Sequence, residues 1–202
     1  MDKLSWLDVP ERDALPEDVQ ALFGKAEEKT GLVPNVFKVF SLTPQHFMKW
    51  FKYYDFLMRS EESELSRAER EMIGVTVSTE NRCEYCLGSH SAALRELVDD
   101  PIKADVLTHN YRRADLSARE RALLDFAVEL THNSFEMTPD DLEPLREVGL
   151  SDEAIFEAAQ VAAMFNFTNR LANALGWKPN DEYYSQHRSS SLEPAKEPIS
   201  TD

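Results

Sequence analysis

The chain contains 202 residues, of which 22 are Lys or Arg, 37 are Asp or Glu, and 42% are apolar. This length suits a single domain with a substantial core. The formal net charge of −15 argues against nucleic acid or an anionic membrane as a partner, since both are bound through clustered basic side chains. The chain holds only six glycines, which leaves few sites for tight hairpin turns, so we expect helices.

The beginning of the chain does not resemble a targeting segment. Its first six residues include charges and lack the apolar stretch of a signal peptide. The longest apolar run, 158–167, is interrupted by Gln160 and Asn166 and falls short of the roughly 20 residues that span a membrane. We therefore expect a soluble cytoplasmic protein.

Helix signals begin at Pro16, which opens a predicted helix over 16–29. Two further helices are predicted over 36–40 and 45–59. In the last of these, aromatic residues recur at helical spacing. We interpret them as core packing rather than as an aromatic binding site: Phe47, Trp50, Phe51 and Tyr54.

Two later helices begin with the same capping box, a Ser followed three positions later by a Glu. The boxes run from Ser66 to Glu69 and from Ser117 to Glu120, and similar apolar residues follow both at a constant offset of 51 residues. This similarity predicts an internal repeat of one helical unit.

The remaining predicted helices lie over 138–148 and from Ser151 to Leu175. No alternating apolar run of strand length competes with them, so we predict an all-α fold. We expect one domain over 1–177 and a C-terminal extension over 178–202, whose Ser-, Pro- and charge-rich end should be flexible.

The main chemical signal is the pair of cysteines, Cys83 and Cys86, followed by His90. On a helix these side chains share one face, and the two cysteines are close enough for reversible disulfide formation. His90 could take the proton of Cys86, whereas a helix start near Asn81 would favour a thiolate at Cys83. We favour Cys86 as the attacking thiol and Cys83 as the resolving thiol, because a charge-assisted partner is more specific than an exposed helix end.

Glu71 is the candidate acid for orienting the histidine. It lies among apolar residues of a predicted helix, where a carboxylate is costly without a partner. On one unbroken helix it would lie about 18 Å from Cys83, so the chain must reverse between them, and 78–81 is the expected break. The second copy of the repeat lacks this set, having at the equivalent positions Ala122, Ser134, Met137 and Asp141.

These residues resemble the alkyl hydroperoxide reductase D-like (AhpD-like) branch of the carboxymuconolactone decarboxylase superfamily, and within it the peroxidase-related proteins. The motif that carries the resemblance is Glu71, followed twelve positions later by Cys83-x-x-Cys86-x-x-x-His90. Similarity extends over most of the chain, including 31–37 and 165–173.

The resemblance implies an all-helical homo-oligomer that reduces hydroperoxides through thiols, with no metal or other cofactor. It implies that Cys86 is the peroxidatic thiol, that Cys83 resolves, and that Glu71 and His90 form a proton relay. It also implies a dithiol electron donor, either a lipoyl-bearing adaptor or a thioredoxin-like protein.

One departure from the family concerns Tyr85, which stands where the founding peroxidases have a second histidine. A phenol titrates near pH 10 and transfers protons weakly, so we expect slow peroxide turnover or a different substrate. Tyr85, Asn166 and Asn169 are possible pocket residues. For the two asparagines we favour a plainer role, satisfying buried backbone groups or forming a subunit contact.

Three alternatives remain open at this point. A zinc site would need a fourth ligand beside the two cysteines and His90. A redox sensor or interaction module could form the same disulfide without turning over peroxide. A carboxymuconolactone decarboxylase-like enzyme is the third, although an attacking dithiol has no evident task in that reaction.

Overall fold

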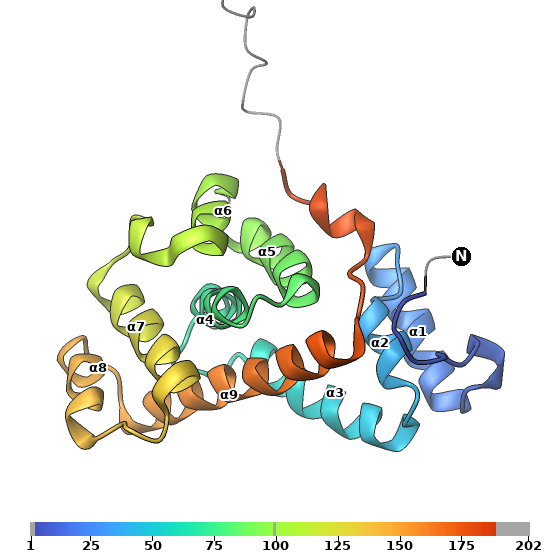
Figure 1. Cartoon of the computed structure of the whole chain (residues 1–202), viewed down its shortest axis with the longest axis horizontal. Helices are drawn as coiled ribbons and strands as arrows, with labels where there is room; N and C mark the ends of the chain where they lie inside the picture. Colours follow the sequence, from blue (N-terminus) through green and yellow to red (C-terminus); the bar gives the residue numbers. More distant parts are fainter. Residues whose placement is uncertain (1–2, 99, 189–202) are drawn as a thin grey trace, which may run out of the picture.

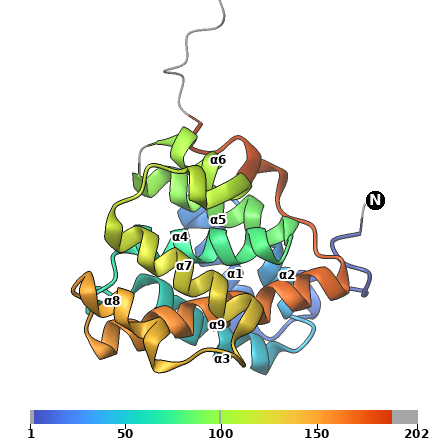
Figure 2. The same ribbon diagram turned by 60° about the vertical axis from the view of Figure 1, so that its left-hand side comes forward.

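The computed structural model describes residues 3–98 and 100–188, and within them the chain is all-α, with helices and turns and no strand. The helices are α1 (Glu17–Thr30), α2 (Asn35–Phe40), α3 (Pro44–Arg59), α4 (Arg67–Glu80), α5 (Glu84–Val98), α6 (Pro101–Asn110), α7 (Ala118–Asn133), α8 (Glu143–Glu147) and α9 (Asp152–Leu175). Short 3-10 turns are η1 (Arg12–Ala14), η2 (Tyr111–Arg113), η3 (Pro139–Leu142) and η4 (Asp181–Tyr184). Figures 1 and 2 show α4 in the centre, with α5, α6, α7 and α9 around it.

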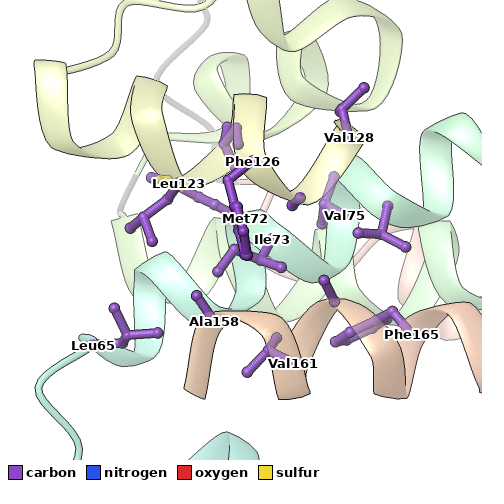
Figure 3. Packing of buried hydrophobic residues seen from close by; sticks show 14 of the residues in the cluster. Leu65, Met72, Ile73, Val75, Leu123, Phe126, Val128, Ala158, Val161 and Phe165 are labelled. Atoms are coloured by element: carbon purple, nitrogen blue, oxygen red, sulfur yellow. The ribbon is translucent and has the colours of Figure 1, made fainter. Parts of the chain in front are cut away.

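The central helix α4 is buried along most of its length, from Arg70 to Ser78. Its apolar side chains pack between α7 and α9, where Met72 and Ile73 face residues of both helices (Figure 3). Gly74 allows α4 and α9 to approach each other closely, because a Cβ atom at this position would lie 2.3 Å from the ring of Phe165 on α9. This packing fixes α4 as the frame on which the neighbouring helices are positioned.

The predicted repeat is visible in the starts of the helices. Both capping boxes form, with the side chains of Ser66 and Ser117 each accepting a backbone N–H three residues later. The starts of α6, at Pro101, and α9, at Asp152, are also 51 residues apart. The two copies differ in the stretch between these helix starts. In the first copy this stretch forms α5, and in the second it forms η3 and α8.

Two elements differ from the prediction. The helix expected over 138–148 divides into η3 and α8, because Pro144 lacks the N–H that a continuous helix would use. Helix α6 was not predicted, although Asp100 caps it and Pro101 occupies its first turn, which are ordinary start signals.

Residues 178–188, here called the C-terminal strap, follow α9 and lie against α2 and α5. Asn180 accepts the N–H of Asn35 at 2.7 Å, and Arg95 of α5 donates to the carbonyls of Tyr183, at 2.6 Å, and Gln186, at 2.9 Å. The domain limit at 177 stays a prediction, and the end expected to be flexible lies in 189–202, outside the described residues. Within the described part of the chain, no helix is long and apolar enough to cross a membrane.

Candidate active site

The chain reverses between α4 and α5, close to the expected break. Helix α4 runs to Glu80, Arg82 adopts a positive φ of 52°, and the N–H of Cys83 bonds the carbonyl of Ser78 at 2.9 Å. The reversal lays α5 against α4. As a result, Nδ1 of His90 lies 2.7 Å from Oε2 of Glu71.

The Glu71–His90 pair is largely buried, with side-chain exposures of 11% and 13%. The acid that broke the apolar pattern of α4 therefore has a partner. The imidazole is held further by an edge contact with Phe165, whose ring centroid lies 4.6 Å away. With Nδ1 occupied by the carboxylate, Nε2 is the ring nitrogen left to exchange a proton.

Cys83 and Cys86 occupy different positions at the start of α5. The carbonyl of Cys83 accepts the N–H of Leu87 at 2.9 Å, so Cys83 is the N-cap residue and Cys86 lies in the first turn. The two cysteines are free and separated by 3.4 Å. Both are buried, with exposures of 0% for Cys83 and 3% for Cys86.

The environment separates the two thiol pKa values. The hydrogen bond with the Cys86 thiol lowers the pKa of Cys83 to about 7, against the opposing effect of burial, with help from the Cys86 N–H and from His90. The same bond, burial and the charge of Cys83 raise the pKa of Cys86 well above its ordinary value. This order is the reverse of the one expected from His90 alone, because Cys83 accepts the hydrogen bond of the Cys86 thiol and also the N–H of Cys86 at the helix start.

A cavity of about 240 Å³ borders the site. Cys86, His90 and Glu71 lie in its lining. Several aromatic residues contribute to the wall, among them Trp50, Phe51, Tyr54, Tyr85, Trp177 and Tyr183. A small molecule in this cavity would therefore meet the sulfur of Cys86 in an apolar, partly enclosed space.

Tyr85 belongs to this wall but is already engaged. Its hydroxyl oxygen accepts the N–H of Val36 at 2.8 Å, and it also pairs with the hydroxyl of Tyr183. Burial raises its pKa well above the ordinary value. The phenol thus ties α5 to α2 and to the C-terminal strap.

Asn169 and Asn166, both on α9, fall in different surroundings. Asn169 is fully buried, donates to Ser78 Oγ at 3.1 Å, and hydrogen-bonds both cysteines. Asn166 instead donates to the carbonyl of Ala162 at 3.1 Å and accepts from Asn81 at 2.9 Å. Asn81 also donates to Asn169 at 3.0 Å, so these amides fasten the α4–α5 turn to α9.

Two residues near the thiols were not singled out as site candidates from the sequence. Thr168 of α9 lines the cavity and hydrogen-bonds Cys86. Tyr54 of α3, interpreted as core packing, also lines the cavity and stacks on Trp50 at 5.1 Å between ring centroids. Helical spacing identifies an inward face, but it does not show where that face borders a cavity.

No group of three or more His, Cys, Asp or Glu side chains suited to hold a metal ion occurs within residues 3–98 and 100–188.

The chain matches the model of the carboxymuconolactone decarboxylase family over residues 45–110. The crystal structure of an alkylhydroperoxidase AhpD core, an uncharacterised peroxidase-related protein from Ralstonia eutropha JMP134, is 40% identical with a TM-score of 0.90, and the match covers 94% of this chain and 99% of that one. A peroxidase-related protein from Silicibacter sp. TM1040 is 43% identical with a TM-score of 0.89, covering 93% of this chain and 97% of that one. The debrominase Bmp8 shares the fold at 18% identity and a TM-score of 0.73, covering 91% and 95% respectively. The chain therefore belongs to the AhpD-like, peroxidase-related branch of the carboxymuconolactone decarboxylase superfamily.

Proposed function

We propose that the protein is a thiol-dependent peroxidase that reduces hydroperoxides through a dithiol–disulfide cycle of Cys83 and Cys86. The observation that carries the proposal is the buried Glu71–His90 pair, which lies with Cys86 in the lining of one cavity. An acid–base pair beside a thiol is the arrangement that activates a sulfur nucleophile.

The cavity favours Cys86 as the attacking sulfur. The resting thiolate is favoured at Cys83, but the sulfurs are hydrogen-bonded, so one proton can pass from Cys86 to Cys83. The Cys86 thiolate then attacks the hydroxyl-bearing oxygen of the hydroperoxide, the O–O bond breaks, and an alkoxide leaves. The Glu71–His90 pair is the source of the proton that converts the alkoxide to an alcohol.

The resulting sulfenic acid at Cys86 is resolved by Cys83. The Cys83 sulfur forms the disulfide, and the sulfenic oxygen leaves as water with the Cys83 thiol proton. A dithiol donor then reduces the disulfide. We propose a lipoyl-bearing adaptor or a thioredoxin-like protein for this role, and a homo-oligomer in the cytoplasm as the working form.

Steady-state hydroperoxide consumption with dihydrolipoyl and thioredoxin donors tests the proposal. Cys86→Ser should abolish consumption, whereas Cys83→Ser should permit one oxidation and then stall. If Cys86→Ser still underwent the first oxidation and Cys83→Ser did not, the attacking thiol would be Cys83 instead. Oxidation of the native protein in a single burst, with no turnover by any donor, would favour a redox sensor instead.

A further inference from the structure

The leaving oxygen of a hydroperoxide needs a hydrogen-bond donor, and the cavity offers several hydroxyl groups. Most of them are already engaged: Thr30 with the Ala26 carbonyl, Ser89 with the Tyr85 carbonyl, Thr168 with the Met164 carbonyl, and Tyr85 with Val36 and Tyr183. Among the hydroxyl groups that line the cavity in the described residues, Tyr54 alone has no hydrogen-bond partner.

Contacts of the aromatic ring fix the position of Tyr54. The ring stacks on Trp50 at 5.1 Å and meets the His90 imidazole edge-on at 6.2 Å, both measured between centroids. Arg59 lies 6.0 Å from the same ring centroid. These contacts hold Tyr54, whose hydroxyl is unpaired, in the lining of the same cavity as Cys86 and Glu71.

The charge state of Tyr54 suits a donor. Burial, followed by the negative charge of Glu71, raises its pKa above the ordinary value of a phenol. The hydroxyl therefore keeps its proton throughout the physiological pH range.

We propose that Tyr54 is a catalytic residue that donates a hydrogen bond, and then its proton, to the departing alkoxide oxygen. The inference rests on the proposed peroxidase function. Cys86 forms the S–O bond, the O–O bond breaks, and the alkoxide takes the Tyr54 proton. The His90 imidazolium, which carries the proton lost by the thiol pair, restores the phenol, so protons and electrons balance.

The test compares leaving groups in Tyr54→Phe, which removes only the hydroxyl. The single-turnover oxidation rate with tert-butyl hydroperoxide, whose alkoxide needs a proton, should fall about 100-fold. With peracetic acid, whose carboxylate leaves without a proton, the rate should change by less than about threefold. Alkylation by iodoacetamide, which releases iodide, should be unchanged. Tyr53→Phe, on the same helix and 43% exposed, is the matched control and should match the native protein in all three reactions.

Equal losses with both oxidants, or slower alkylation, would show that Tyr54 acts on the thiols or on packing and would overturn the inference. No loss with tert-butyl hydroperoxide would overturn it as well. A native protein that neither oxidant oxidises, although iodoacetamide still alkylates its thiols, would refute the peroxidase function itself, and the inference would fall with it.

Discussion

Among single residues, Cys83 and Cys86 have the same side chain and nearly the same burial, yet they occupy different chemical environments. Cys83 caps α5, where its sulfur accepts the N–H of Cys86 and the hydrogen bond of the Cys86 thiol. Cys86 lies one turn further on and borders the cavity. The N-cap position therefore favours the thiolate, and in the mechanism proposed above the first turn presents the attacking sulfur.

This division predicts the order of thiol titration. In the native protein, thiolate should appear as the pH rises through about 7, because the depressed pKa of Cys83 is reached first. In Cys86→Ala the titration of Cys83 should move upward, since its largest stabilising hydrogen bond is lost. Ultraviolet absorbance of the thiolate against pH measures both. The complementary variant, Cys83→Ala, leaves only the buried Cys86 thiol. We expect the pKa of this thiol to be higher than the pKa of Cys83 in Cys86→Ala. The opposite order of the two pKa values would contradict the assignment.

Glu71 is predicted to act through His90. Glu71→Gln keeps an acceptor for the imidazole but removes the charge that stabilises imidazolium, so hydroperoxide oxidation should slow about 10- to 100-fold and lose part of its pH dependence. The pH profile of the oxidation rate measures this. The matched control is Glu80→Gln, which alters a second Glu–His pair, formed with His132 at 2.7 Å near the surface. If both variants show native profiles, Glu71 has no part in the relay.

At the scale of elements, the contact between α4 and α9 sets the position of the site. The ring of Phe165 lies against Gly74 and also meets the imidazole of His90 edge-on. In Gly74→Ala the new methyl group would overlap the Phe165 ring, which should lower the free energy of unfolding by about 1–3 kcal/mol and displace the imidazole. Denaturant unfolding and the oxidation rate report the two effects.

Gly24→Ala in α1 is the control for that change. Its Cβ atom would meet only the end of the Arg12 side chain, at 3.4 Å. Alanine favours helix over glycine by up to ~1 kcal/mol, so this variant should be neutral or more stable than the native protein. Equal destabilisation by both substitutions would mean that the Phe165 contact is not the cause, since helix propensity favours alanine at both positions.

The elements also show what the sequence can and cannot specify. Capping boxes at Ser66 and Ser117 predict helix starts because the signal is local and chemical. The break at Pro144 is likewise a local signal, but the prediction of one helix over 138–148 used only the start and stop signals at its two ends. Tyr54 shows the limit, since one inward face of α3 serves both core and cavity, and only the tertiary arrangement separates them.

On the scale of the whole molecule, the C-terminal strap and α3 both contribute residues to the wall of the cavity. Tyr183 and Gln186 lie in the cavity lining, and Arg95 holds the carbonyl groups of both. The guanidinium of Arg95 is itself buried, so its hydrogen bonds are made away from bulk water. Access to Cys86 should therefore depend on how firmly Arg95 retains the strap.

Arg95→Leu should loosen the strap, because two partly buried carbonyl groups would lose their donor. We expect faster hydrogen exchange over 181–188 and faster modification of Cys86 by a bulky maleimide. The control is Arg146→Leu, which removes a 40%-exposed arginine. Its ion pairs, with Glu143 and Asp152, do not involve the C-terminal strap. Unchanged exchange and modification in Arg95→Leu would show that Arg95 does not govern access.

The site draws on three helices that are separate in sequence: α4 supplies Glu71, α5 and its N-cap residue supply the two cysteines and His90, and α9 supplies Asn169. The sequence indicated the first four of these residues through the motif and the misplaced carboxylate. It did not indicate the pKa order of the thiols, because that order depends on where α5 begins. Cys83 accepts the N–H of Cys86 because it is the N-cap residue, and a helix that began three residues later would give Cys86 that position.

The most direct measurement is the stoichiometry of one turnover: thiols lost per hydroperoxide consumed, with peptide mass mapping of the product. The dithiol cycle predicts two thiols lost for each hydroperoxide and a peptide that links Cys83 to Cys86. Hydroperoxide consumption with both thiols still titratable, or oxidation that leaves these cysteines unlinked, would contradict it.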